Sequence, residues 1–433
     1  MTRKSIFLGI FSFVMTAMVG KAVYADQMMS WQDCVQKIHT GNADLAASVA
    51  NVKSLDALYG SSYSNFFPQI SAQIGYNASS NGGSAPNPGS LTQTVYTSTQ
   101  YSDALSLNQS LFNGFTDEGK VEQGRANWKA AVAQLELEKV TLSSTLKTNF
   151  AQLLFEQKSV ELTDAILKRQ MTNLRMIDLR FRGGSENKGS LLFQQATVSQ
   201  ARYQHEHAIR QLRNASKQLA ALWGDPDNES VRLTGELTAH APAKAPNFED
   251  IAAKHPNHAN YVEQTFSAVA AIKVADGNWY PNVNLLASVG NVSQNEFFDP
   301  AGSRWSAGVV LTYPLFPGNS NIFGSQNARA LKMQAQFQQY STDYKLVAAL
   351  ETAYEALLDA VAQVGVSEEF QNAAQARSKI ANGKYNTGLM TFEDWTVIDQ
   401  DLVNREQNLL QSQLNAMQAE ATWENAEGVG DIK

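Results

Sequence analysis

Hydrophobic residues recur every seven positions along two stretches of the chain that contain no proline. Proline is absent between Pro88 and Pro226 and again after Pro317. In the first stretch one seven-residue series is apolar apart from Lys139, and a second apolar series runs three positions away from it. The first series comprises Val132, Leu146, Leu153, Val160, Leu167, Leu174 and Phe181, and the second comprises Val121, Trp128, Leu135 and Leu142. Two apolar positions per heptad predict long helices that pack as in coiled coils.

The first long helix is predicted from Phe115 to Arg182, which makes it about 100 Å long at a rise of 1.5 Å per residue. It ends before Gly183-Gly184, because glycine readily takes the left-handed conformation that closes a helix. A return helix of about half that length is predicted from Gly189 to Leu222. A further half-length helix, residues 30–63, would lie end to end with the return helix and so match the long helix.

The second half of the chain repeats the first at a constant offset of 204 residues. Leu111-Phe112-Asn113-Gly114, for example, returns as Leu315-Phe316-Pro317-Gly318. An internal duplication predicts two similar repeats, residues 26–240 and 241–433, each with a half-length helix, two strands, a long helix and a return helix. The helices of the second half are accordingly predicted at residues 247–278, 318–384 and 391–427.

Four segments between the half-length and long helices alternate apolar and polar residues, which predicts β-strands with one apolar face. They lie at residues 69–76, 101–111, 282–290 and 304–313, and Asp103 and Gln109 interrupt the apolar face of the second. The connections are polar and are predicted at residues 78–98 and 293–303. Strands of about ten residues have the length of a tilted membrane strand, although a soluble β-sandwich would show the same alternation.

Aromatic residues near the strand ends favour membrane strands over a sandwich, because outer-membrane barrels carry aromatic girdles at both interfaces. These residues are Tyr76, Tyr101, Trp279, Tyr280, Trp305 and Tyr313. Four strands cannot close a barrel, and an open strand edge cannot face lipid. Several chains must therefore share one barrel, and a trimer would supply twelve strands.

The N-terminus has the pattern of a secretory signal peptide. Arg3 and Lys4 precede an apolar run, and small residues end at Ala25, where cleavage is predicted. Removal of residues 1–25 changes the formal net charge from −7 to −10, because Arg3, Lys4 and Lys21 leave with them. Such acidity argues against nucleic acid as a partner.

The sequence contains no pattern for catalysis, a cofactor or a metal site. His205 and His207 are two residues apart, so on a helix they point to different faces, and His255 and His258 have no third ligand nearby. No phosphate-binding loop, nucleophile elbow or metalloprotease motif occurs. The single cysteine, Cys34, excludes an intrachain disulfide and is expected to be buried on a helix. We therefore expect a protein that is not an enzyme.

The chain resembles the TolC-like outer-membrane efflux protein family. The resemblance rests on the helix-tip pattern Tyr385-x-x-Gly388-x-x-Thr391-x-x-Asp394 and on the Leu-Phe-x-Gly strand-to-helix junction, and it covers essentially all of the mature chain. It implies a mainly α-helical protein with a membrane β-barrel, in which three chains form a twelve-stranded barrel that continues into an α-helical periplasmic tunnel. The implied function is an outer-membrane channel that passively conducts cargo from an inner-membrane pump and a periplasmic adaptor to the exterior.

The same resemblance assigns roles to three groups of residues. The pore constriction falls on Asp394 and on Val397, which stands where the family often has a second acid. The adaptor contacts at the helix tips fall on Phe181, Gly184, Ser190, Tyr385, Gly388 and Thr391. The strand-to-helix junctions fall on Leu111, Phe112, Gly114, Leu315, Phe316 and Gly318.

Plainer readings of these residues remain open. Asp394 would also be favoured at the start of a helix by the helix dipole, and Gly184 and Gly388 would also be needed simply to turn the chain. A soluble periplasmic coiled-coil scaffold or adaptor is the alternative function, and it would not need strands that face lipid. The sequence does not identify the exported cargo.

Overall fold

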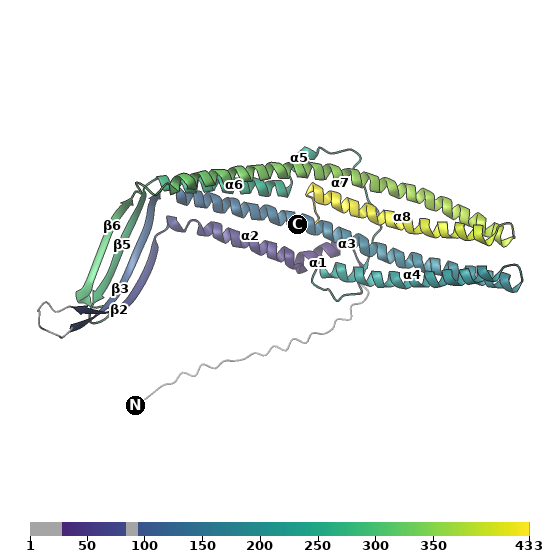
Figure 1. Cartoon of the computed structure of the whole chain (residues 1–433), viewed down its shortest axis with the longest axis horizontal. Coiled ribbons are helices and arrows are strands. Elements are labelled where there is room, and N and C mark those ends of the chain that lie inside the picture. Colours follow the sequence, from purple (N-terminus) through teal and green to yellow (C-terminus); the bar gives the residue numbers. More distant parts are fainter. Residues whose placement is uncertain (1–27, 84–93, 433) are drawn as a thin grey trace, which may run out of the picture.

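Two helices of 67 residues each dominate the computed structural model, which describes residues 28–83 and 94–432 (Figure 1). They are α3 (Thr116–Arg182) and α7 (Ser320–Asn386), and both are about 100 Å long. The predicted long helices are therefore confirmed. The predicted signal peptide, residues 1–25, lies outside the described residues.

The shorter helices cover the two long ones in pairs. The return helices α4 (Lys188–Ala221) and α8 (Phe392–Glu427) pack on the far halves of the long helices, and α2 (Ala43–Ser61) and α6 (Pro256–Asp276) pack on the halves near the sheet. Helix α3 contacts all four of them, whereas α7 contacts α6 and α8. Helix α3 is thus the central element, and one flank of α7 is left uncovered.

The prediction of one continuous helix over residues 30–63 was wrong. Helix α1 (Trp31–Gly41) ends at Asn42, whose side chain accepts a hydrogen bond from the N–H of Leu45 at 2.7 Å and so begins α2. The Asn42 amide also donates to the Leu222 carbonyl at 2.8 Å, at the end of α4. Asparagine is a strong N-cap, so it starts a new helix here rather than continuing the old one.

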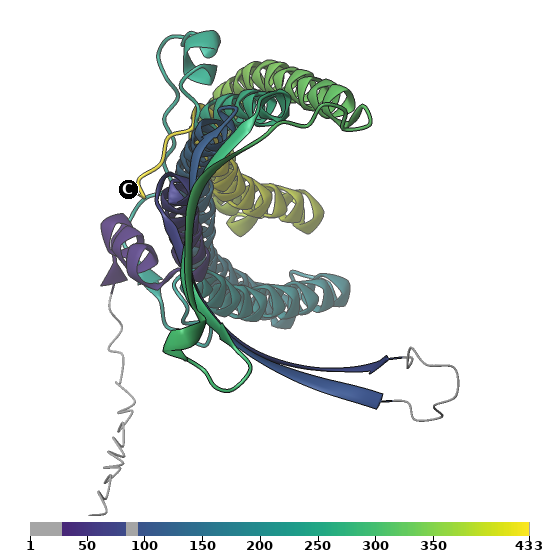
Figure 2. The same cartoon turned by 90° about the vertical axis from the view of Figure 1, so that its left-hand side faces the viewer.

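The helix predicted over residues 247–278 is interrupted in the same way. It consists of α5 (Phe248–Ala252) and α6, which begins at Pro256. A residue before proline is pushed out of the helical region, and His255 has φ −66° and ψ 137° accordingly. Seen along the long axis, the helices and the sheet follow one arc, and α1 and α5 lie on its convex side (Figure 2).

The four predicted strands form one antiparallel sheet in the order β2-β3-β5-β6. Strands β5 (Asn282–Ser293) and β6 (Ser303–Thr312) have about the predicted length. Strands β2 (Gln69–Gly83) and β3 (Thr94–Asn113) are longer than predicted, because pairing continues through the Asn, Ser and Thr residues of the expected connection as far as Gly83 and Thr94. Strands β2 and β6 are the edges of the sheet.

The two faces of the sheet have opposite character. Leu105 lies directly opposite both Ala72 and Val289, and Val289 lies opposite Trp305, so these four side chains share one face. That face is apolar and exposed, with Trp305 79 % accessible. The other face carries Gln, Asn and Ser residues such as Gln69 opposite Asn108. This two-sided alternation agrees with the sequence prediction.

The largest hydrophobic core lies midway along the helices. Leu146 and Leu153 of α3 are fully buried there together with Cys34 of α1. Short strands β1 (Met28–Met29) and β4 (Arg232–Leu233) pair in parallel in the same region. The Trp31 indole N–H donates to Asp431 Oδ2 at 2.8 Å, and the Asp431 N–H donates to Ser143 Oγ at 3.0 Å. Among the described residues, none of the helices combines the length and the hydropathy that a membrane span requires.

Candidate functional site at the helix tips and junctions

The strand-to-helix junctions turn the chain through two consecutive left-handed residues. These are Gly114 and Phe115 in the first half and Gly318 and Asn319 in the second, all with φ of 65° or 66°. A side chain at position 114 would collide with the backbone of Gly277, whereas position 318 has no neighbouring atom within 4 Å. Glycine is thus required at the first junction by packing and conformation, and at the second by conformation.

Aromatic rings gather at the first junction. Phe112, Phe115 and Tyr280 pack edge to face, with ring centroids 5.4 to 6.4 Å apart. Leu111 is half exposed, and at the second junction Leu315 and Phe316 are 89 % and 79 % exposed. The junction residues therefore present large apolar side chains at the helix end of the sheet.

Both helix tips are closed by the same turn. Gly184 and Gly388 have φ of 75° and 78°, and the N–H of the following residue, Ser185 or Leu389, donates at 2.8 Å to a carbonyl in the last turn of the long helix. This is the hydrogen-bond pattern of a left-handed helix cap. Space around both glycines is open, so their conformation is sufficient reason for glycine at these positions.

The return helices begin with side-chain caps. Asn187 accepts from the Ser190 N–H at 2.9 Å, and Thr391 Oγ1 accepts from the Asp394 N–H at 3.1 Å. Phe181 is 37 % exposed, whereas Ser190 is buried. Asp394 is exposed, and its carboxylate accepts from the Thr391 hydroxyl at 2.9 Å. Asp394 therefore takes part in capping the start of α8, which is the simpler of the two roles expected from the sequence.

Tyr385 ties the two helix tips together. Its hydroxyl donates to Glu186 Oε2 at 2.6 Å, and its carbonyl accepts from Arg180 Nη1 at 2.9 Å. Arg180 also lies over the Tyr385 ring at 4.6 Å, and Trp395 stacks on that ring at 4.9 Å. The family resemblance assigns Tyr385 to the adaptor contacts; in the single chain the residue is 1 % exposed and holds the tips of α3 and α7 to each other.

The surroundings of Glu186 favour its ionised form. Partial burial favours the neutral acid, but hydrogen bonds from the Tyr385 hydroxyl and the Asn187 N–H outweigh it and lower the pKa of Glu186 below its usual 4.5. Burial raises the pKa of the Tyr385 hydroxyl, and the neighbouring Glu186 raises it further. At neutral pH the pair is thus an ionised acceptor and a neutral donor.

A groove between the tips of α4 and α8 brings two predicted site residues together. It has a volume of about 430 Å³, and Ser190 and Val397 both line it. Its floor is aromatic, since Phe193 and Phe392 meet edge to face at 6.0 Å. Val397 is 68 % exposed, one helical turn beyond Asp394.

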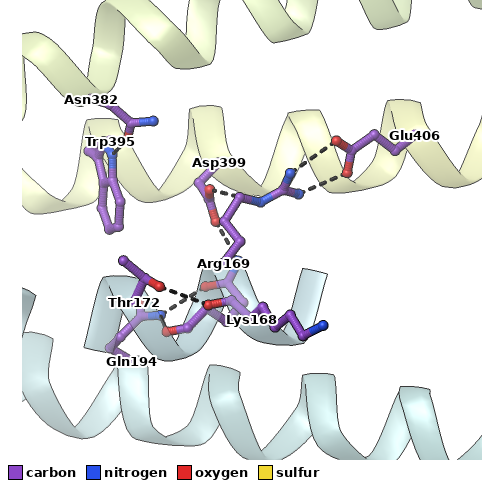
Figure 3. A network of polar contacts seen from close by, with 9 residues as sticks. Lys168, Arg169, Thr172, Gln194, Asn382, Trp395, Asp399 and Glu406 are labelled. Carbon is purple, nitrogen blue, oxygen red and sulfur yellow. Dashed lines mark hydrogen bonds and ion pairs between the residues drawn. The ribbon is translucent and has the colours of Figure 1, made fainter. Parts of the chain in front are cut away.

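A polar layer that sequence reasoning missed joins α3, α4 and α8 behind the tips (Figure 3). Arg169 binds Glu406 through two hydrogen bonds of 3.0 and 2.8 Å. The Gln170 amide donates to Asp399 Oδ2 at 2.6 Å and accepts from Gln194 at 2.8 Å. Gln170, Gln194 and Asp399 are all buried.

The signal for this layer was present in the second heptad series. Continued past Leu142, that series reaches Asn149, which is half-buried, and then Glu156, Thr163, Gln170 and Ile177, all of which are buried. Four of these five residues are polar, so a search for apolar repeats ends too early.

Three of the histidines, His205, His255 and His258, occupy structural positions. His205 Nδ1 lies 3.3 Å from the Thr163 hydroxyl, His258 lies 2.7 Å from Asp343, and His255 caps α6. Within residues 28–83 and 94–432, no three His, Cys, Asp or Glu side chains converge as a metal site would need.

The comparisons with known proteins agree with this architecture. The chain matches the family described as outer membrane efflux protein over residues 34–225 and 259–429. It is 23 % identical to the solvent efflux pump outer membrane protein SrpC and to the toluene efflux pump outer membrane protein TtgI, both of Pseudomonas putida, over 90 % of this chain and 83 % of each relative.

Two solved structures show the same fold. The outer-membrane channel OprN superposes with a TM-score of 0.80 at 18 % identity, over 92 % of this chain and 90 % of that one. CusC superposes with a TM-score of 0.82 at 16 % identity, over 94 % of this chain and 96 % of that one.

Proposed function

The chain belongs to the outer membrane efflux protein family, and from this premise we propose that it is the outer-membrane channel of a multi-component export system. The observation that carries the proposal is a four-stranded sheet with one exposed apolar face, continued by helices about 100 Å long. The apolar face suits the hydrocarbon of a bilayer, and the helices are long enough to cross much of the periplasm. The channel is passive, and the pump supplies the energy.

Three chains form the channel in this proposal. Each sheet has two free edges, β2 and β6, and unpaired backbone groups cannot face lipid. Pairing β6 of one chain with β2 of the next closes a barrel of twelve strands, within the range of bacterial barrels. The two repeats, residues 26–240 and 241–433, then supply six similar units around the tunnel.

The helix tips form the periplasmic end of the tunnel. We assign the pore constriction to Asp394, with Val397 one turn further along the same helix, so that three carboxylates would attract cations there. The capping of α8 by Thr391 is compatible with this role, since the Asp394 side chain stays exposed. The proposed contacts for a periplasmic adaptor protein are the helix tips at Phe181, Gly184, Ser190, Tyr385, Gly388 and Thr391, of which Ser190 and Tyr385 are buried in the single chain.

The test is to purify the protein in detergent, measure its mass and record its conductance in a planar bilayer. A trimer with a small, cation-selective conductance is expected. A monomer that stays in solution without detergent and forms no channels would contradict the proposal and favour the soluble scaffold or adaptor instead.

A further inference from the structure

The polar face of the sheet carries almost no charge. From Gln69 to Asn113 the sequence contains one charged residue, Asp103, and from Asn282 to Thr312 it contains Glu296, Asp299 and Arg304. Of these four groups, Asp103 and Arg304 lie in strands, whereas Glu296 and Asp299 lie in the β5–β6 connection. Because directly paired residues share a face, the strand register decides which of the two strand residues points into the barrel.

Arg304 lies on the polar face. It is paired with Gly290, which is paired with Ala104, which in turn is paired with Gln73. This row faces away from the apolar row of Leu105, Val289 and Trp305, so it faces the lumen of a barrel whose apolar side meets lipid. Arg304 is exposed, and the two nearest residues in the row, Gly290 and Ala104, are small.

None of the three acids lies on the polar face of the strands, and Glu296 is exposed in the β5–β6 connection. Asp103 is paired with Ile74 and therefore sits on the apolar face, where its carboxylate accepts the Phe298 N–H at 2.9 Å. Asp299 accepts from Ser293 Oγ at 2.7 Å and from the Ala301 N–H at 3.0 Å, within the β5–β6 connection. Ser293 is paired with Tyr101, two residues before Asp103 on β3, so this connection folds against the apolar side.

The neighbouring chain does not neutralise Arg304 either. The strand that would pair with β6 is β2 of the next chain, and no residue from Gln69 to Gly83 is charged. Within the described part of the chain, Arg304 forms no ion pair. Its guanidinium is thus the one charge on the lumen face of the described strands.

We propose that the three copies of Arg304 form a basic ring in the outer part of the barrel, which binds multivalent anions such as chains of phosphate. The inference rests on the proposed trimer. Arg304 is the second residue of β6, at the end of the sheet far from the helices, so the ring lies near the outer mouth. A guanidinium presents paired N–H donors that match phosphate oxygens.

The size of the barrel makes the ring effective at moderate salt. Twelve strands spaced 4.8 Å apart and tilted by roughly 40° enclose a bore about 24 Å across between backbones. No point of this bore is more than about 12 Å from the wall, which is close to the Debye length of about 10 Å at 0.1 M salt. At 1 M salt the Debye length falls to about 3 Å, and the ring should then be screened.

The test uses the full-length trimer in a planar bilayer at 0.1 M potassium chloride, with inorganic tripolyphosphate added to one chamber and then to the other. The wild-type current should be blocked from one side only. Arg304→Gln should raise the half-blocking concentration about tenfold or more, Arg304→Lys should stay within about threefold, and the difference should vanish at 1 M salt. Arg329→Gln, which removes an arginine from α7, is the matched control and should leave the block unchanged.

The outcomes separate the two proposals. If trimers conduct but the Arg304→Gln channel is blocked like the wild type, the basic ring is wrong and the channel function stands. If block is equal from both chambers, the ring does not lie near one mouth and the inference fails. If the protein forms neither trimers nor channels, the proposed function fails and the ring with it.

Discussion

Tyr385 and Glu186, 199 residues apart, make the contact that holds the two helix tips of one chain together. A sequence pattern could select Tyr385 and the turn glycines, because tips of this kind repeat within the chain. A sequence pattern could not select Glu186, because no neighbouring residue indicates that Glu186 accepts a hydrogen bond from the Tyr385 hydroxyl. The same holds for Gln170 and Asp399, whose pairing depends on how three helices are brought side by side.

Removing the Tyr385 hydroxyl should loosen the tips. Tyr385→Phe deletes a hydrogen bond to a charged acceptor, which contributes about 1.5 to 3 kcal/mol. Amide protons at Gly184 to Ser190 should therefore exchange at least about ten times faster, measured by mass spectrometry. Tyr354→Phe is the control, because Tyr354 is also buried but forms no side-chain hydrogen bond within the described residues. Equal exchange in the two variants would contradict the assigned contact.

Acid should weaken the same contact. The pKa of Glu186 is lowered in the folded tip from 4.5, so its stabilising effect is complete above about pH 4.5 and is lost as the pH falls through the lower, folded value. Protection of the tip amides, corrected for intrinsic exchange, should fall below pH 4.5 in the wild type. Glu186→Gln should show weaker protection at neutral pH and no such acid step. A step of equal size in Glu186→Gln would assign it to another group.

The charge of Asp394 should govern cation block from the periplasmic side. Asp394→Asn keeps an oxygen that can accept from Thr391 but removes three carboxylates from the trimer, so a trivalent cation should block about tenfold less well. Single-channel recording measures this. Asp178→Asn, which neutralises an acid near the other tip, should keep the wild-type block. Undiminished block in Asp394→Asn would remove this residue from the constriction.

At the scale of the elements, the heptad pattern predicted the first long helix and the internal repeat predicted the second, each to within about two residues, but neither predicted the breaks at Asn42 and His255-Pro256. The spacing of apolar residues shows which side of a helix is buried. When the helices before and after a break bury the same side, the apolar pattern continues across the break and does not reveal it. The lengths of β2 and β3 were underestimated because the apolar pattern stops before the pairing does. Polar residues near Gly83 and Thr94 carry no apolar signal, although their backbones still pair.

The polar layer on α3 should contribute to holding α8 in place. Arg169→Met leaves the partly buried Glu406 without its two hydrogen bonds, which should destabilise the packing of α8 by about 2 to 3 kcal/mol. Hydrogen exchange along residues 399–406 reports the change. The control is Lys168→Met, since among the described residues Lys168 forms an ion pair only with Asp164, at the exposed surface, where ion pairs contribute little. Similar exchange in both variants would mean that the layer adds no stability.

At the scale of the whole molecule, the single chain exposes apolar surfaces that it does not cover itself. Besides the apolar side of the sheet, α7 exposes a row of aromatic side chains, with Phe323, Phe337 and Tyr344 between 66 % and 77 % accessible. Phe337 and Tyr344 are seven residues apart, so they lie on one helix face. An extended exposed apolar surface of this kind marks an interface, and the proposed trimer would cover it.

A charge placed on this face should prevent assembly. Phe337→Asp would bury an unpaired carboxylate three times in the trimer, at a cost of about 3 kcal/mol or more for each copy. Light scattering of the detergent-purified protein should show monomers, while circular dichroism shows unchanged helix content. Phe337→Leu and Gln338→Asp, a neighbouring exposed position, should both remain trimeric. A trimeric Phe337→Asp protein would place the interface elsewhere.

The contact between Trp31 and Asp431 has a consequence for the timing of biogenesis. A chain that is exported from its N-terminus presents Trp31 to the periplasm 400 residues before Asp431. This contact in the middle of the molecule cannot form until Asp431 has been translocated, and contacts of such long sequence separation form slowly. During that interval the aromatic faces and the strand edges are exposed together, so the nascent chain should depend on periplasmic chaperones until its two ends have met.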